Sequence, residues 1–283
     1  MNPTTFTLTQ ALQHCQRQGL ERLDAQMLVL LACGQGLHQR AWLLTHDGDV
    51  LTDAQQASLQ AALARRLSGE PMAYITGSKE FFGLSLQVDA RVLDPRPDTE
   101  TLVEWALELL QERQSARVVD LGTGSGAIAL ALKSQCPSAT VEAVDYSADA
   151  LAVARANAQR LQLDVRFAQG SWLEPVVGAF DLIVSNPPYI AAADPHLAAL
   201  RHEPLSALAS GADGLDDIRT IIAQSMQHLL RGGWLLLEHG YDQAQEVQAL
   251  LTQAGFAHAQ SRHDLAGIAR CTGAQWPGVA ANA

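Results

Sequence analysis

Apolar residues in the first 75 positions recur every three or four residues, which is the spacing of amphipathic helices. This pattern predicts helices over residues 8–19, 24–33 and 40–44. A fourth helix is expected after Thr52, because Thr52 and Gln55 have the spacing of a capping box. Its apolar residues fall on one stripe, formed by Leu59, Leu63 and Leu67. Short polar connections join these segments, so we expect a small bundle of antiparallel neighbours.

A strand pattern replaces the helical one within residues 76–98. Apolar residues alternate with polar ones at Leu84, Leu86 and Val88. Such alternation is typical of a strand with one buried face. We expect residues 89–91 to form a turn and residues 92–93 to form the returning strand. The segment is therefore predicted to be a β-hairpin that links two domains.

Beyond the hairpin, strand and helix patterns alternate. Asp98 or Thr99 is expected to cap a helix that runs through Leu110. Strands are predicted over residues 117–121, 141–145, 164–168, 181–185 and 234–239. Helices are predicted over residues 127–134, 148–162, 215–230 and 243–254. Phe256 and residues 270–272 are expected to supply the last strands, in antiparallel orientation.

This alternation implies a parallel sheet covered by helices on both faces. The predicted fold class is α/β, with a helical bundle over residues 1–75, a hairpin linker over residues 76–98 and an α/β domain over residues 99–283. Residues 191–214 show little periodicity, and loops of that length are usually either functional or disordered.

The composition is that of a globular protein, with 48% hydrophobic and 17% charged residues in a chain of 283. No window approaches the roughly 20 apolar residues of a membrane span, and the N-terminus has no pattern of a secretory signal. The four cysteines form no C-x-x-C pair, and the nine histidines show no metal-ligand spacing. We therefore expect a cytoplasmic protein without a metal site or a disulfide framework.

The net charge of −11 is unevenly distributed. Residues 1–75 carry five basic and six acidic side chains, whereas the rest carries 14 basic and 24 acidic ones. Tight nonspecific binding to nucleic acid needs a basic surface, so direct nucleic-acid binding is not expected. The acidic surface would suit a basic protein partner, and solubility explains it equally well.

The most informative short segment is Asn186-Pro187-Pro188-Tyr189, which follows the predicted strand over residues 181–185. The residue before a proline favours extended geometry, and both prolines have a fixed φ and no N–H. The turn is therefore stiff, and its carbonyl oxygens are free to accept beside the flat face of Tyr189. Two acceptors and a ring suit a planar NH2 group, which predicts chemistry at an amide or exocyclic amine nitrogen.

A second segment, Gly122-Thr123-Gly124-Ser125-Gly126, lies between a predicted strand and a predicted helix. Its glycines allow a sharp turn and close approach to a ligand, and the helix start offers free N–H groups and a positive dipole end. Asp145 lies about 20 residues further on, at the spacing of an acid that binds ribose hydroxyls. The G-x-G-x-G spacing differs from the dinucleotide fingerprint, and it fits S-adenosylmethionine better than NAD.

Each of these two segments also has an ordinary interpretation. Asn-Pro is a common turn starter, and a glycine-rich turn can be a mere connection. Both segments, however, follow predicted strands in one α/β pattern, where open sheets bind ligands at the carboxyl ends of strands. Their coincidence favours a ligand site.

Six segments carry a resemblance to a known family, namely residues 73–77, 80–84, 95–100, 120–129, 186–190 and 237–240. On these segments, and over nearly its whole length, the chain resembles the PrmC/HemK family of protein methyltransferases, which modify a glutamine in peptide chain release factors. Residues 95–100, Pro-Arg-Pro-Asp-Thr-Glu, are more specific than the Asn-Pro-Pro-Tyr motif, which adenine methyltransferases share. Asp94 and Ala90 depart from the family pattern, where an apolar residue and a proline are usual, and they leave the details of the hairpin open.

The resemblance implies an α/β fold of the Rossmann-like methyltransferase type. It implies contacts to S-adenosylmethionine from Gly122, Thr123, Gly124, Ser125, Gly126, Asp145, Trp172 and Asn186. It implies contacts to the substrate glutamine from Asn186, Pro187, Pro188 and Tyr189, of which Asn186, Pro187 and Tyr189 are the candidate catalytic residues. Trp172 follows a predicted strand, where an adenine would need a flat neighbour, and a half-buried core position is the alternative.

The implied activity is methyl transfer to the side-chain nitrogen of the glutamine in the GGQ motif of class I release factors, in support of translation termination. The expected protein is a monomer that needs no metal, and its helical domain is expected to dock the release factor. Which release factors are preferred is left open by the sequence.

An amide nitrogen is a poor nucleophile, whereas a sulfonium methyl group is already activated, so the protein must mainly align the reacting atoms. The Asn186 side-chain oxygen and the Pro187 main-chain oxygen can accept both amide hydrogens, and they favour a nitrogen that gains positive charge. No residue is assigned as a nucleophile.

The main rival is an adenine methyltransferase, which would flip a base into the same pocket and would want a basic groove. A noncatalytic sensor of S-adenosylmethionine is a second rival, and it would not need the Asn186–Tyr189 acceptor set.

Overall fold

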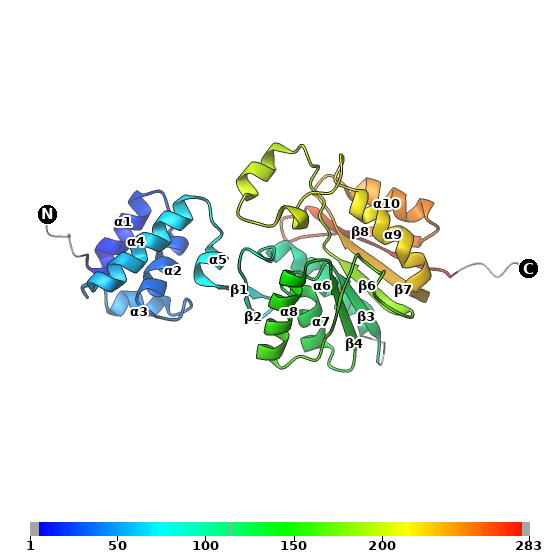
Figure 1. The fold of residues 1–283 in the computed structure, drawn as a ribbon, viewed down its shortest axis with the longest axis horizontal. Coiled ribbons are helices and arrows are strands. Elements are labelled where there is room, and N and C mark those ends of the chain that lie inside the picture. The colour runs from blue at the N-terminus through cyan, green and yellow to red at the C-terminus, as the bar shows by residue number, and fades with distance from the viewer. Residues whose placement is uncertain (1–5, 112, 114, 279–283) are drawn as a thin grey trace, which may run out of the picture. The chain divides into compact units, whose positions relative to one another are not determined.

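The computed structural model describes residues 6–111, 113 and 115–278. The chain divides into two compact units, Met1–Gly77 and Ser78–Ala283, which we call the helical unit and the α/β unit. The first five residues of the predicted bundle and the last five of the predicted α/β domain lie outside the described residues. Figure 1 shows the order of the elements along the chain, from blue at the N-terminus to red at the C-terminus.

The helical unit contains α1 (Leu8–Arg17), α2 (Arg22–Ala32), α3 (Arg40–Thr45), α4 (Asp53–Leu67) and α5 (Met72–Thr76). Thr7 and Thr52 each form a capping box, at the start of α1 and of α4. Helix α2 packs against both α1 and α4, and Leu28 and Leu59 lie in the fully buried core that these helices enclose. Helix α5 was not predicted, because five residues that follow Pro71 are too short to show a helical period.

The hairpin of residues 76–98 has a different register from the predicted one. Strand β1 (Ser78–Phe81) pairs antiparallel with β2 (Leu84–Gln87), and residues 92–93 form no strand. Phe82 and Gly83 have φ values of 48° and 74°, so they make a tight two-residue turn of the kind that joins hairpin strands. The Asp89 side chain accepts from the N–H of Arg91 at 3.0 Å, which turns the chain away where the returning strand was expected.

The α/β unit is built on a seven-stranded sheet with the order β5-β4-β3-β6-β7-β9-β8. The parallel strands are β3 (Arg117–Leu121), β4 (Thr140–Asp145), β5 (Arg166–Gln169), β6 (Phe180–Ser185) and β7 (Leu229–Glu238). At the far edge, β8 (Ala257–His263) and β9 (Ala269–Gln275) are antiparallel. The α/β fold prediction is confirmed. The predicted antiparallel strand at residues 270–272 lies in β9, whereas Phe256 lies just before β8.

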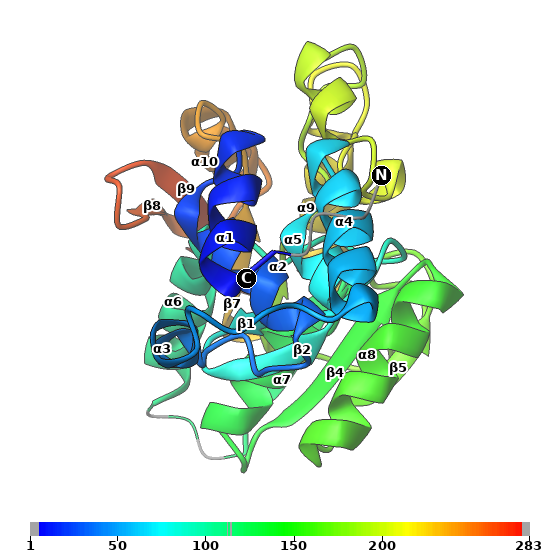
Figure 2. The ribbon, with the colours of Figure 1, turned by 90° about the vertical axis from the view of Figure 1, so that its left-hand side faces the viewer.

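The helices of the unit are α6 (Glu100–Leu110), α7 (Ala127–Gln135), α8 (Ala148–Leu161), α9 (Asp216–His228) and α10 (Ala244–Gln253). Leu235 and Leu237 point into one core cluster together with Ile221 of α9 and Val247 of α10. Because side chains alternate along a strand, Leu236 faces the opposite side, where Trp105 of α6 also lies close to β9 at Gly273. Two helical layers therefore cover the two faces. Figure 2 shows α8 along β4 and β5.

The start of α6 corrects a predicted cap. Residues Pro97–Thr99 form a short 3₁₀ helix that leads into α6, and the Thr99 side chain caps no backbone N–H group. Thr99 already has helical backbone angles, so its hydroxyl is directed elsewhere.

The structure contains no helix, among the residues it describes, that is long and apolar enough to cross a membrane.

Candidate active site

A cavity of about 290 Å³ lies at the carboxyl edge of the parallel strands. Its lining comes largely from the segments that follow β3, β4, β5 and β6, which is where open α/β sheets bind ligands. The residues of the predicted site that line it are Gly122, Gly124, Asp145, Trp172, Asn186 and Pro188. The segments around Leu93 and Ser206, which sequence analysis did not assign to the site, complete the wall.

The glycine-rich segment folds over the end of β4. The backbone N–H groups of Gly122 and Thr123 both donate to the carbonyl oxygen of Val144, at 2.9 and 3.0 Å. A side chain at Gly122 would be strained by a φ of +71°, and its Cβ would lie 3.3 Å from the Trp172 ring. Glycine therefore allows the indole of Trp172 to lie directly against the loop. Trp172 is half-buried and lines the cavity, so it combines a packing role with an exposed ring.

Three predicted cofactor residues of this loop do not line the cavity. The Thr123 hydroxyl donates to the Asp120 carboxylate at 2.6 Å, and both residues are buried. Ser125 is buried, and its carbonyl oxygen accepts from the Asn157 side chain at 3.0 Å. Gly126 has a φ of +85° at the N-cap of α7. In this structure their contacts fix the shape of the loop.

Asp120 is an acidic residue that sequence analysis did not single out. It is fully buried and accepts from Thr123 and from the N–H of Ala129, whereas its Oδ1 has no partner among the described residues. Burial raises the pKa of its carboxyl to about 7, and the two donors oppose the rise. The sequence signal that could have identified Asp120 is a carboxylate among the apolar residues of strand β3.

Asp145 connects the end of β4 to the glycine loop. Its Oδ2 accepts from the N–H of Gly124, and its Oδ1 accepts from the N–H of Ser147, each at 2.9 Å. Burial raises the pKa of Asp145, while these two N–H groups oppose the rise. A carboxylate oxygen can accept more than one hydrogen bond, so Asp145 can still receive hydroxyl groups from a ligand in the cavity.

Asn186 lies at the junction of two cavities. Its side-chain Nδ2 donates to the Thr99 hydroxyl oxygen at 3.2 Å, so the amide group is oriented and its Oδ1 is left to accept. A second cavity of about 180 Å³ adjoins the first, and both have Leu93, Asn186 and Ala207 in their lining. A ligand in one cavity can therefore approach a ligand in the other beside Asn186.

The other residues of the turn differ in which cavity they line. Pro188 is buried and lines the larger one, whereas Pro187 is buried and lines neither. Tyr189 lines the smaller cavity, and its hydroxyl donates to Glu238 Oε1 at 3.3 Å. Burial, reinforced by the Glu238 carboxylate, raises the pKa of the Tyr189 phenol, so this side chain is a neutral donor.

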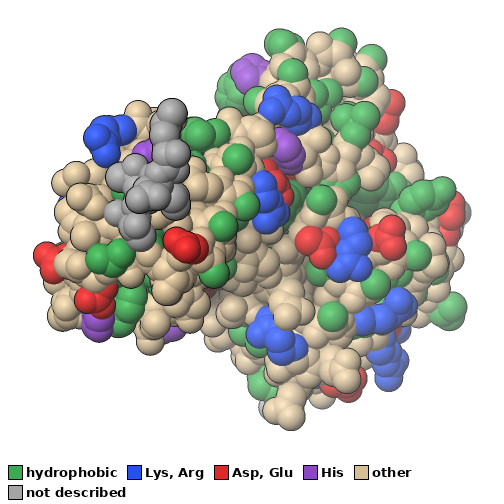
Figure 3. Space-filling view, turned by 60° about the vertical axis from the view of Figure 1, so that its left-hand side comes forward, with side chains coloured by type: hydrophobic (Ala, Val, Ile, Leu, Met, Phe, Trp, Pro, Cys, Tyr) green, Lys and Arg blue, Asp and Glu red, His purple; other side chains and the backbone are tan. Residues whose placement is uncertain are grey.

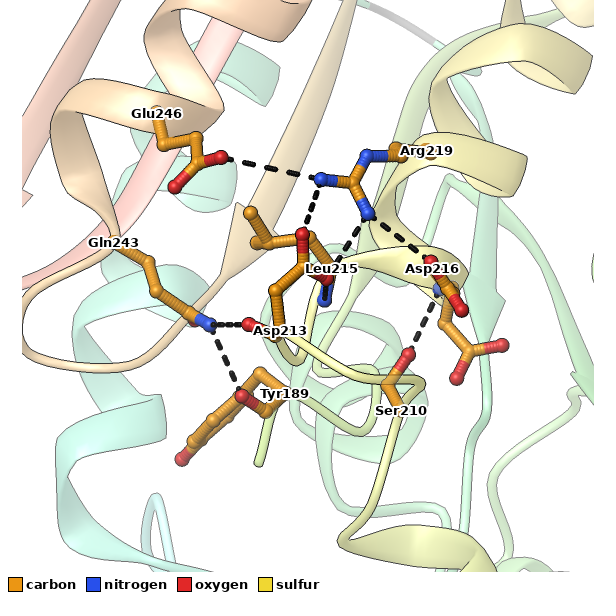
Figure 4. A network of polar contacts seen from close by, with 9 residues as sticks. Tyr189, Ser210, Asp213, Leu215, Asp216, Arg219, Gln243 and Glu246 are labelled. Carbon is orange, nitrogen blue, oxygen red and sulfur yellow. Dashed lines mark hydrogen bonds and ion pairs between the residues drawn. The ribbon is translucent and has the colours of Figure 1, made fainter. Parts of the chain in front are cut away.

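A network of polar contacts that includes Gln243 and Asp213 holds the backbone of Tyr189 in place (Figure 4). The Gln243 side chain donates to the Tyr189 carbonyl oxygen at 3.1 Å and to that of Asp213 at 3.4 Å. Gly214 allows this approach, because a Cβ there would lie 2.2 Å from the Tyr189 carbonyl oxygen. The network therefore fixes the end of the turn against the start of α9.

Residues 191–214, which sequence analysis left as either functional or disordered, form a loop with two 3₁₀ helices, Pro195–Leu200 and Leu205–Ala207. Two backbone hydrogen bonds join the ends of this loop. The N–H of Ile190 donates to the carbonyl oxygen of Leu208, and the N–H of Ser210 donates to the carbonyl oxygen of Ile190, each at 2.9 Å. Because Ala207 lines both cavities, the loop forms a wall that they share.

A partly buried ion pair, in which Glu203 is the buried partner, fastens this loop to the segment that precedes α6. Glu203 accepts from Arg96 Nη2 at 2.5 Å and from the N–H of Asp94 at 3.2 Å. Burial acts to lower the pKa of Arg96, but Glu203 and Asp94 outweigh it and the pKa rises. Asp94, which departs from the family pattern, also pairs with Lys79 at 3.1 Å, so its charge is compensated within the α/β unit.

No group of three or more His, Cys, Asp or Glu side chains is placed to hold a metal ion in residues 6–111, 113 and 115–278. The cavity does contain groups suited to a nucleoside-like ligand: the Asp145 carboxylate for hydroxyls, the Trp172 ring for a flat base and glycine backbone at close range. This set fits the methyl donor that the resemblance implies.

Known protein families match this chain in both of its units. Residues 7–77 match the family model of the PrmC N-terminal domain, and residues 99–207 match that of the methyltransferase small domain. A release factor glutamine methyltransferase from Bordetella pertussis is 52% identical over 259 residues, which cover 90% of this chain and 95% of the relative. The enzyme of the same name from Coxiella burnetii is 45% identical over 251 residues, with 88% and 90% covered.

Among solved structures, a methyltransferase from Pyrococcus furiosus has a TM-score of 0.54 at 19% identity, and the match covers 78% of this chain and all of that one. This likeness concerns the fold alone.

Proposed function

The chain belongs to the family of release factor glutamine methyltransferases, and from this premise we propose how its own residues carry out the reaction. It is an S-adenosylmethionine-dependent methyltransferase that acts on the side-chain amide nitrogen of a glutamine in a release factor. The family prediction made from residues 73–240 is thereby confirmed. We propose that the glutamine is the one in the GGQ motif of class I release factors.

The larger cavity is proposed to hold the methyl donor, which supplies an activated methyl group when bound. Asp145 would accept the ribose hydroxyls, and the Trp172 ring would cover the adenine. Gly122 and Gly124 would admit the ligand close to the backbone. Thr123, Ser125 and Gly126 would contribute by keeping the loop in this shape.

The smaller cavity is proposed to hold the glutamine side chain. The observation that carries this assignment is the place of Asn186, which lines both cavities and whose Nδ2 is held by Thr99. Its Oδ1 would accept one hydrogen of the substrate amide, and Tyr189 would lie beside the amide plane. The Pro187 carbonyl oxygen stays the predicted acceptor of the other hydrogen, although Pro187 lines neither cavity. These acceptors favour a nitrogen that becomes positive as the methyl group arrives, and the turn aligns it without a nucleophilic residue.

The experiment is methylation of a purified release factor, followed by mass spectrometry of its peptides. We expect one added methyl group on a single glutamine, and no product on a release factor whose GGQ glutamine is replaced by alanine. Modification at another residue would contradict the proposed substrate. Plasmid DNA in a parallel reaction tests the adenine-methyltransferase rival.

The charge distribution supports a protein substrate over DNA or RNA. The chain carries −11, and on the face shown in Figure 3 basic and acidic side chains are interspersed on the α/β unit rather than gathered by sign. Nucleic-acid binding draws on a basic patch or stripe. We also propose a reducing, cytoplasmic location, which the four free cysteines support. The monomeric state stays a prediction.

We propose that the helical unit docks the release factor. It carries no chemistry-bearing motif, yet residues 7–77 match a domain model of their own. A glutamine side chain resembles every other glutamine, so selectivity must come from contacts remote from the reacting nitrogen.

A further inference from the structure

Glu238 is a charged residue whose position the reaction described above does not explain. It ends β7, it is only 2% exposed, and its Oε2 has no hydrogen-bond partner among the described residues. A buried carboxylate with an unsatisfied oxygen is costly to the fold. Such a residue is worth testing for a role at the site.

The neighbours of Glu238 are residues of the proposed glutamine site. Strand β7 is paired in parallel with β6 so that Leu237 lies opposite Ser185, which brings Glu238 level with Asn186. The Tyr189 hydroxyl donates to Glu238 Oε1 at 3.3 Å. The Thr99 hydroxyl is also a polar neighbour of the carboxylate and opposes the rise of its pKa, whereas Tyr189 makes the hydrogen bond of ordinary geometry to it.

A relay from Glu238 to Asn186 follows when the Thr99 hydroxyl donates to the neighbouring carboxylate. A hydroxyl has one hydrogen to donate and two lone pairs. If Thr99 donates to Glu238, its oxygen can only accept from Asn186, as the 3.2 Å contact to Nδ2 shows. The side-chain amide of Asn186 is then held in one of its two orientations, with Oδ1 available for the substrate.

We propose that Glu238 is a positioning residue: as a carboxylate it holds the Thr99 and Tyr189 hydroxyls as donors, and Thr99 in turn orients the Asn186 amide for the substrate. The inference rests on the proposed function, because it concerns the same glutamine site. A protonated Glu238 would itself donate a hydrogen bond. It would then compete with the two hydroxyls and release the Asn186 side chain.

The charges around Glu238 place this change near neutral pH. Burial raises the pKa of Glu238 to about 7, Thr99 and Tyr189 oppose the rise, Asp98 adds to it and Arg270 opposes it. From β9, Cys271 also faces the carboxylate, but burial raises its own pKa to about 12, so it stays a neutral thiol. A carboxyl with a raised pKa is ionised only above that value, so the aligned state is expected above about pH 7 and is lost as the pH falls through it.

The test compares the wild-type enzyme with Glu238→Gln across pH 6 to 9, with saturating methyl donor and whole release factor. Glutamine keeps the shape of the side chain and mimics the protonated acid. We expect the wild-type kcat to fall below about pH 7, and the variant to show a kcat at least about tenfold lower at pH 8 with no acid limb. Donor affinity, measured by calorimetry, is expected to stay within about threefold, because Glu238 does not line the larger cavity.

A second pair of variants tests the relay even if Glu238→Gln fails to fold. Thr99→Val removes the hydroxyl at nearly constant size and is expected to lower kcat about tenfold, whereas Thr99→Ser keeps the hydroxyl and is expected to restore most of the rate. A wild-type kcat and acid limb in Glu238→Gln, or equal rates in Thr99→Val and wild type, would overturn the proposal. Absence of product with the wild-type enzyme would instead contradict the proposed function, so the two failures are distinguishable.

Discussion

The side-chain amide of Asn186 donates to the hydroxyl of Thr99 across 87 positions of sequence, at a distance of 3.2 Å. This contact joins the turn after β6 to the segment that enters α6. It connects residues 95–100 with the Asn186–Tyr189 motif, and we propose that the first segment orients the acceptors that the second supplies. Asp98 or Thr99 was predicted to cap the helix, and the Thr99 hydroxyl accepts from Asn186 instead.

Asn186→Ala is expected to lower kcat at least about 100-fold while donor affinity changes little, because it removes an acceptor that acts mainly in the transition state. Single-turnover methylation of a release factor measures the chemical step directly. Asn186→Asp is the size-matched variant and should also fail, since a carboxylate cannot donate to Thr99 and adds charge near the donor. Near-normal turnover of either variant would refute the assignment.

Asp145→Ala is expected to weaken binding of the methyl donor by about 1–3 kcal/mol, the range for hydrogen bonds to a charged group. The structure adds a second cause, because Asp145 also accepts from the N–H groups of Gly124 and Ser147. Asp145→Asn separates the two effects, since its Oδ1 can keep one of these backbone bonds. Calorimetry with the demethylated product measures both variants. An unchanged dissociation constant for Asp145→Ala would mean that the glycine loop has another role.

The sequence predicted the elements that have a periodic pattern of apolar residues and the site residues that lie next to such elements in the chain. Helical spacing located α1 and α4, and the alternation of patterns gave the parallel sheet. Asp145, Trp172 and Asn186 could be named because each lies at or shortly after the carboxyl end of a strand, and all three line the same cavity. What was missed has partners far away in sequence: Glu238 contacts Tyr189 across 49 positions, and Glu203 contacts Arg96 across 107. Such pairs leave no periodic signal.

The hairpin illustrates a different limit. Leu84 and Leu86 do lie in a strand, but they pair with the preceding segment rather than the following one. The choice depends on Phe82, a non-glycine residue at a φ of 48°. Bulky residues rarely adopt that conformation, so Gly83 alone was too weak a signal to predict a turn there.

Glu203→Ala is expected to destabilise the α/β unit by about 1–3 kcal/mol, because the Asp94 N–H loses its acceptor and the Arg96 guanidinium keeps only its ion pair with Asp94, at 3.4 Å. Since the neighbouring Pro204 and Ser206 line the larger cavity, the KM for the methyl donor should rise as well. Thermal unfolding and initial rates measure the two effects.

Arg219→Ala is the matched control for this loop. Arg219 pairs with Asp213, Asp216 and Glu246 at an exposed position (Figure 4), where such pairs contribute less than about 1 kcal/mol. Equal losses of stability in Glu203→Ala and Arg219→Ala would contradict the role given to the pair that Glu203 forms with Arg96.

A chain that begins at Ser78 tests the docking role of the helical unit. The boundary between the two units lies at Gly77 and Ser78, so this truncation leaves the sheet and both cavities with all their lining residues. We expect calorimetry to show nearly unchanged donor binding. Activity on whole release factor should fall at least about tenfold, mainly through a higher KM, because binding energy from remote contacts is lost. Activity on a short glutamine-containing peptide, which is too small to reach a remote surface, should fall much less. If peptide and whole protein lost activity equally while donor binding stayed intact, the helical unit would support the fold of the enzyme rather than recognise its substrate.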